Sequence, residues 1–170
     1  NPLRIPEFSA EERDLIAAAF APVFEVETGG AYDRIGALAW GDALSPVVDA
    51  ARALVYFRVA YTRYGGQVLP QLVYTAWFAE RPVQGILDIL GGALDGIVWR
   101  VTLSAQGAPL VYDSIHPCGC YHMFFPTPRV QAVAAPAGVG EWAFVPATLP
   151  LHTAGARIAG GRGSDQFAAA

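Results

Sequence analysis

The residue types best suited to chemistry gather in one short segment, residues 116–122, which reads HPCGCYH. This segment holds both cysteines of the chain and two of its three histidines. Two thiolates and two imidazoles form a ligand set that suits Zn²⁺ and is also acceptable to copper. The pattern therefore predicts a metal site formed by His116, Cys118, Cys120 and His122, with zinc ahead of copper.

Strand geometry sets a condition on this site. In an extended strand, residues two apart share a face, and each such step covers roughly 6.6 Å. His116 and His122 would then stand about 20 Å apart, too far to share one ion through bonds of about 2.0–2.3 Å. Pro117 and Gly119 permit a loop, because proline removes a ladder donor and glycine allows unusual φ values. We expect the cysteines and at least one histidine to converge if the segment turns.

A metal site of this kind could also be catalytic. If only three side chains reach the ion, an open position leaves room for water, and the site would suit a metal-dependent hydrolase. His152 is the only other histidine and could complete a ligand set. Asp113 and Glu80 are candidates for a supporting acceptor or a general base. The sequence leaves open whether the protein is an enzyme.

Two other uses of the cysteines compete with the metal site. The segment Cys118-Gly119-Cys120 could be a redox dithiol, since a disulfide across one residue closes a small strained ring, and strained disulfides are oxidising. A nearby histidine would lower a thiol pKa and raise its reactivity. Alternatively, the cysteines are structural parts of a non-enzymatic envelope or interaction module, because free cysteine is among the most buried residue types.

Aromatic and arginine side chains form a weaker lead. Four Trp, seven Tyr and nine Phe could line a small-molecule cleft, which predicts a deep apolar pocket away from the cysteines. Half-buried sheets also use aromatic residues simply to fill a core. The arginines of the expected sheet could bind a carboxylate or phosphate, or pair with acidic residues across strands; they are Arg58, Arg63, Arg81 and Arg100.

Composition describes a globular domain. The 170 residues suit a single domain, and 54% hydrophobic with 15% charged residues allow a substantial core. No apolar run is long enough for a transmembrane segment. All 11 basic residues are arginine, the net charge is −4 and no basic cluster exists, so we expect no nucleic-acid partner. A small-molecule or protein partner stays open.

The elements that must position the segment are mostly strands. A capping box at Ser9 and Glu12 predicts a helix over 10–20. Alternating β-branched and aromatic residues predict one hairpin from 54–63 and 71–78, closed by Gly65-Gly66, and a second from 97–103 and 110–115. Further expected elements are strands at 23–26, 121–125 and 142–145 and short helices at 45–52 and 83–90.

These elements predict an α+β fold: an antiparallel sheet of about five or six strands built from β-hairpins, with the N-terminal helix packed on it. A parallel sheet is not expected, because alternating βαβ order is missing. Residues 1–152 form the predicted domain, and 153–170 a weakly structured tail or truncated continuation with a short strand near 156–158. We expect an exported or cell-envelope protein of a bacterium, with the cytoplasm as the alternative compartment.

Overall fold

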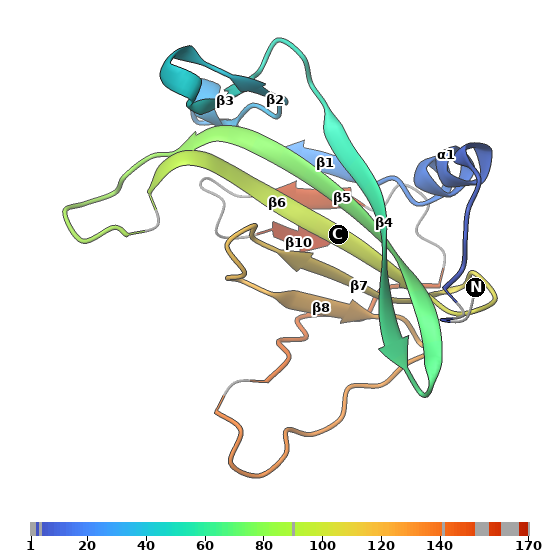
Figure 1. Cartoon of the computed structure of the whole chain (residues 1–170). Helices are drawn as coiled ribbons and strands as arrows, with labels where there is room; N and C mark the ends of the chain where they lie inside the picture. Colours follow the sequence, from blue (N-terminus) through green and yellow to red (C-terminus); the bar gives the residue numbers. More distant parts are fainter. Residues whose placement is uncertain are drawn as a thin grey trace.

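A five-stranded antiparallel sheet forms the centre of the computed structural model, which describes residues 3, 5–89, 91–140, 142–151, 157–160 and 167–169 (Figure 1). The strands follow chain order, so each one pairs with the next along the sequence. They are β4 (Val55–Tyr64), β5 (Gln67–Arg81), β6 (Gly92–Leu103), β7 (Pro109–Ile115) and β8 (Met123–Pro126). The predicted antiparallel, hairpin-built character of the fold is confirmed.

Tight turns join these strands where the sequence places glycine. Gly65 and Gly66 have φ of +55° and +77° between β4 and β5, as the two-residue hairpin requires. Between β6 and β7, Gly107 has φ of +79°, and the N–H of Ser104 donates to the carbonyl of Ala108 at 2.7 Å. Both predicted hairpins are confirmed, although β5 and β6 extend further than the alternation indicated.

Side-chain alternation divides the sheet into two chemically different faces. Trp99 is fully buried on the core face, and its ring lies 5.7 Å from that of Tyr112 and 5.8 Å from that of Phe125. The predicted set Ile97, Trp99, Val101 and Leu103 is buried in this core. The intervening residues on β6, including Arg100, point to the opposite face. The two faces can therefore carry separate chemistry.

Helix α1 (Ala10–Ala19) begins at the predicted capping box. The Ser9 hydroxyl accepts from the N–H of Glu12 at 3.2 Å, and the Glu12 carboxylate accepts from the N–H of Ser9 at 2.8 Å. These reciprocal bonds satisfy two N–H groups that a helix start leaves unpaired. The helix predicted over 10–20 is confirmed.

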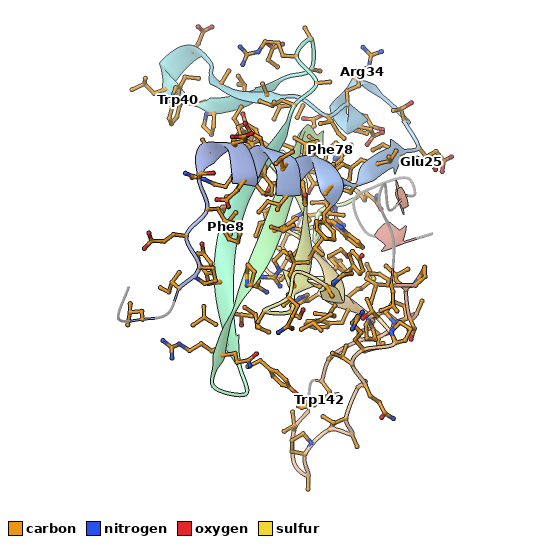
Figure 2. All side chains as sticks on the ribbon, turned by 90° about the vertical axis from the view of Figure 1, so that its right-hand side faces the viewer. Phe8, Glu25, Arg34, Trp40, Phe78 and Trp142 are labelled. Atoms are coloured by element: carbon orange, nitrogen blue, oxygen red, sulfur yellow. The ribbon has the colours of Figure 1, made fainter. Side chains whose placement is uncertain are left out.

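Contacts between α1 and the sheet come from a few long side chains. Ile16 and Phe20 pack against the core of the sheet, and the Tyr74 hydroxyl donates to the carbonyl of Ala17 at 2.8 Å. Figure 2 looks onto α1, which crosses in front of the curled strands. Phe8 lies on the segment that leads into the helix.

Two smaller sheets flank the central one. In the first, β2 (Ala37–Trp40) and β3 (Pro46–Asp49) form an antiparallel hairpin. In the second, β1 (Val23–Val26) pairs in parallel with β9 (Arg157–Gly160), which pairs antiparallel with β10 (Phe167–Ala169). No parallel sheet was expected, and the one parallel pair among the described strands, β1 with β9, lies in a mixed sheet and forms without a βαβ unit. Two short 3₁₀ helices, η1 (Ala31–Asp33) and η2 (Asp42–Leu44), complete the elements.

Strands β9 and β10 lie within the segment 153–170, for which the sequence predicted a weakly structured tail. The strand expected near 156–158 overlaps β9. The predicted domain boundary at 152 stays a prediction.

Three local predictions fail for identifiable reasons. The helix predicted at 45–52 is β3 instead, because Val47 and Val48 pair with β2 across a tight turn in which the N–H of Gly41 donates to the Ser45 carbonyl at 2.8 Å. Residues 83–89 form turns rather than a helix, with Asp88 accepting from backbone N–H groups on both sides. The strand expected at 142–145 is a single bridge between Phe144 and Met123.

The turns at 83–89 expose apolar side chains at the tip of the long β5–β6 hairpin, Ile86 and Ile89 among them.

In the described part of the chain, no helix combines the length and apolar character that a membrane crossing needs.

Candidate functional site

The loop between β7 and β8 turns sharply, as convergence of the cysteines and a histidine requires. The N–H of Gly119 donates to the carbonyl of His116 at 2.8 Å, and the N–H of His116 donates to the carbonyl of Cys120 at 3.0 Å. Gly119 has φ of +94°, which glycine tolerates and other residues rarely adopt. Tyr121 also has positive φ, at +55°. The segment is therefore a closed loop and not a continuous strand.

This loop brings a thiol, an imidazole and a carboxylate into one row. His116 Nδ1 lies 2.9 Å from Cys118 Sγ, and His116 Nε2 is hydrogen-bonded to Oδ1 of Asp95. Asp95 lies on β6 and is only 4% exposed, whereas Cys118 is exposed at the loop surface. The order Cys–His–Asp, with the carboxylate inside and the thiol outside, is the arrangement of an activated cysteine nucleophile.

The hydrogen bonds around His116 select one form of the neutral ring. A proton on Nε2 donates to Asp95, which leaves Nδ1 as an acceptor facing the Cys118 thiol. The backbone N–H of Cys118 also points at Nδ1, at 3.4 Å. His116 is therefore oriented to take the thiol proton, and the resulting imidazolium would be stabilised by the buried carboxylate.

The pKa values of the two cysteines are shifted in opposite directions. The pKa of Cys118 is lowered, chiefly because the backbone N–H of Cys120 donates to its sulfur, with further contributions from the Cys120 thiol and from His116. The pKa of Cys120 is raised, because its thiol donates to Cys118 and its ionisation would place a second negative charge beside the first. Cys118 is therefore the thiol that ionises first.

His122 belongs to a different cluster. Its Nε2 lies 3.0 Å from Oδ1 of Asp113 and 2.9 Å from Nη2 of Arg100, and its ring lies 4.0 Å from that of Phe124. Arg100 forms an ion pair with Asp113 at 2.6 Å, and the Asp113 side chain is only 2% exposed. Nε2 of His122 thus lies between the Arg100 donor and the Asp113 carboxylate, away from the cysteines, and the supporting role expected of Asp113 at a metal site stays a prediction.

Hairpin register explains why the two histidines separate. Ser114 on β7 pairs with Met123 on β8, and opposite residues in an antiparallel pair share a face. Continuing this register places Ile115 opposite His122. Because neighbouring residues point to opposite faces, His116 lies on the face of Ser114 and His122 on the face of Arg100. The histidines diverge even though the loop closes.

The predicted metal site is therefore only partly assembled. Across the ranges that the structure describes, no three His, Cys, Asp or Glu side chains form a group able to hold a metal ion. The prediction of zinc or copper at His116, Cys118, Cys120 and His122 stays a prediction. His152 lies outside the described residues. Glu80 pairs with Ala93 along β5 and β6 and has no hydrogen bond to the cysteine loop among the described contacts.

Sequence reasoning did not single out Asp95 as a site residue. The signal was nevertheless present in the alternation of β6. Asp95 occupies the same phase as Ile97 and Trp99, so it marks a carboxylate on a face that is otherwise apolar. A buried carboxylate requires a partner, and His116 supplies it.

The aromatic and arginine residues noted in the sequence have different surroundings in the structure. Trp99 is a core residue, whereas Trp40 is 73% exposed and Trp142 is 48% exposed. Arg100 pairs across strands, with Asp113 directly opposite it on β7. Trp142 lies on the long segment below the sheet in Figure 2.

Comparison with known proteins gives no family assignment. No family model matches the chain, and no curated protein or solved structure matches it either. The candidate site is described by its own geometry, in which β6 and the β7–β8 loop bring Asp95, His116 and Cys118 together.

Proposed function

We propose that the protein catalyses thiol–disulfide exchange, with Cys118 as the attacking thiol and Cys120 as the resolving thiol. The observation that carries this proposal is the 2.9 Å contact between Cys118 Sγ and Nδ1 of a histidine whose other nitrogen is held by buried Asp95. The thiolate is the nucleophile in such exchange, so a device that lowers the pKa of one exposed thiol favours the reaction.

Each step of the exchange balances within the site and its substrate. The Cys118 thiolate attacks one sulfur of a substrate disulfide, forms a mixed disulfide and releases the other substrate sulfur as a thiolate, which takes the proton held on His116. The Cys120 thiol then loses its proton to His116 and attacks Cys118. The Cys118–Cys120 disulfide forms, the substrate leaves as a dithiol, and two electrons have moved from the protein to the substrate.

The reverse reaction donates a disulfide to a substrate dithiol. A disulfide between Cys118 and Cys120 spans only Gly119, and a small strained ring of this kind is readily reduced. This property favours a role as an oxidant of other proteins. An exported or cell-envelope location, which stays a prediction, would supply the oxidising conditions that keep the Cys118–Cys120 pair in its disulfide form.

The exposure of the site supports a macromolecular substrate. Cys118 and Cys120 are both exposed, and they lie on the loop between β7 and β8. A disulfide or dithiol of another protein chain can reach such a loop directly. The buried parts of the site, Asp95 and most of His116, are those that need no contact with the substrate.

A test compares the reaction of three reduced chains with glutathione disulfide, followed by mass spectrometry. The wild type is expected to pass quickly to an intramolecular disulfide. Cys120→Ser is expected to accumulate a mixed disulfide at Cys118, because no resolving thiol is present. Cys118→Ser is expected to react at least about tenfold more slowly, because His116 Nδ1 faces the sulfur of Cys118, and the remaining thiol lacks that contact.

Two outcomes would contradict the proposal. One is equal reaction rates for Cys118→Ser and Cys120→Ser, which would show that His116 and Asp95 activate neither thiol. The other is a wild type that reacts no faster than the same chain unfolded in urea. Circular dichroism of all three chains controls for loss of the fold.

A metal site at His116, Cys118, Cys120 and His122 is the second candidate. The observation that favours it is that Cys118 Sγ contacts both His116 and the Cys120 thiol. The fourth ligand requires His122 to leave Arg100 and Asp113. Metal analysis of purified wild type with added Zn²⁺ or Cu⁺ decides the question. A chain that takes up neither ion is evidence against the site, and Cys118→Ser and Cys120→Ser are the matched controls.

We also propose that α1 is a docked part of the domain and not an appendage. The hydrogen bond from Tyr74 to the Ala17 carbonyl and the contacts of Ile16 and Phe20 with the core support this arrangement. Burial raises the pKa of Tyr74, so its hydroxyl stays protonated and available as the donor.

A further inference from the structure

A cavity of about 870 Å³ lies where the N-terminal segment and α1 meet the turn ends of the central sheet. Phe8, Ile16 and Phe20 line it from the helix side, and Val68 and Leu103 line it from the strands. No residue of the Cys118 loop is among its described lining residues. The cavity is therefore separate from the proposed thiol site.

The walls of this cavity are mainly apolar. Phe8, Ile16 and Phe20 are only half-buried, so part of their surface meets water inside the cavity. Apolar surface that stays in contact with water is unfavourable relative to apolar surface that is covered. An occupant with an apolar body would remove this cost, and the volume is within the usual range for small-molecule sites.

One charged side chain breaks the apolar lining. Arg63, near the end of β4, is the only charged residue among the described residues of the wall. Its side chain is exposed, and within the described part of the chain no hydrogen bond or ion pair of the guanidinium is seen, although its backbone pairs with Val68. Gln67 and Ser104 are the uncharged polar side chains among the described lining residues. The cavity thus has one cationic point at its open side and an apolar interior.

We propose that this cavity binds an amphipathic carboxylate, with the apolar tail inside and the carboxylate on the Arg63 guanidinium. A guanidinium matches a carboxylate through two parallel hydrogen bonds. A single cation suits a monoanion better than a polyphosphate, and the net charge of −4 disfavours highly charged anions further. Arg63 can keep the carboxylate at the water-facing mouth while the tail is buried.

The experiment is isothermal titration of the full chain with decanoate below its micelle-forming range, with 1-decanol as the uncharged analogue. Saturable binding of decanoate is expected, with weaker binding of 1-decanol. Arg63→Gln should weaken decanoate binding at least about tenfold, because a charge-assisted pair is lost, and should leave 1-decanol binding nearly unchanged. Arg52→Gln, an exposed arginine in a different loop, is the matched control and should bind like the wild type.

A second variant tests the interior. Ala105 lines the cavity from the exposed β6–β7 turn, so Ala105→Trp should fill the space without disturbing the core, and both ligands should lose binding. Urea unfolding verifies that each variant is folded. The proposal is overturned if decanoate does not bind saturably, if Arg63→Gln binds it as well as the wild type, or if Ala105→Trp leaves binding unchanged.

Discussion

The buried carboxylate of Asp95 accepts a hydrogen bond from Nε2 of His116, and so fixes the imidazole with its second nitrogen toward Cys118. The relationship joins β6 to the β7–β8 loop. It gives a loop histidine an orientation that the loop alone could not enforce. The orientation of the imidazole beside the exposed thiol therefore depends on a residue inside the sheet.

Asp95→Asn tests this dependence. Asparagine can still accept from Nε2 but carries no charge, so the imidazolium that pairs with the thiolate loses its stabilising partner. The pH midpoint for iodoacetamide alkylation of Cys118, measured in a Cys120→Ser background, should move upward by about one unit or less. Asp49→Asn, at an exposed carboxylate on β3, is the control. An unchanged midpoint in Asp95→Asn would remove Asp95 from the site.

The pH profile of the wild type gives a second test. Because the pKa of Cys118 is lowered, its thiolate fraction should rise at lower pH than that of an ordinary cysteine. Alkylation of Cys118 should therefore reach half its maximal rate at lower pH than alkylation of the same chain unfolded in urea. His116→Gln should shift the folded profile upward, toward the unfolded one. Coincident folded and unfolded profiles would contradict the lowered pKa.

Gly119→Ala tests whether loop geometry assembles the site. At φ of +94° an added methyl group meets no neighbouring atom, so the cost is conformational, about 1–2 kcal/mol. The loop should relax, and Cys118 should lose part of its excess reactivity. Gly107→Ala is the matched control, because Gly107 has φ of +79° in another hairpin turn and equally open surroundings. Equal reactivity of Cys118 in the two variants would show that the geometry at Gly119 does not set the reactivity of the thiol.

Arg100→Met tests the cluster on the opposite face. It leaves the Asp113 carboxylate, 2% exposed, with only His122 as a partner, and should lower the free energy of unfolding by about 2–3 kcal/mol. Arg52→Met removes an exposed partner of Asp49 and should cost about 0–0.5 kcal/mol. Urea unfolding measures both. Equal destabilisation of the two variants would argue that Asp113 does not need Arg100.

Tyr74→Phe tests the docking of α1. It removes the donor to the Ala17 carbonyl while it keeps the ring that packs near Phe57, and should cost about 1 kcal/mol. Hydrogen exchange of the α1 amides should accelerate in this variant. Tyr64→Phe, at a tyrosine that is 75% exposed in the β4–β5 turn, is the control. Unchanged exchange in α1 would mean that the hydrogen bond does not hold the helix.

Much of the central fold could be predicted from local pattern. The capping box at Ser9, the glycine pair after Tyr64 and the alternation through Trp99 each specify a helix start, a turn or a strand face within a few residues. Segments 45–52 and 83–90 were misassigned because their local signals are weak. Residues 46–49 form a strand because they pair with β2. Residues 83–89 form turns because they connect the two strands of a long hairpin.

The sequence by itself determined that the chemistry lies in the segment 116–122 and that its Pro and Gly permit a turn. Only the tertiary structure decided which partners meet. The register of β7 and β8 sends His116 and His122 to opposite faces, and the pairing of β6 with β7 brings Asp95 to His116. These choices depend on contacts between residues far apart in the sequence. The reason is geometric: periodicity fixes the face of a side chain, whereas register fixes its neighbour.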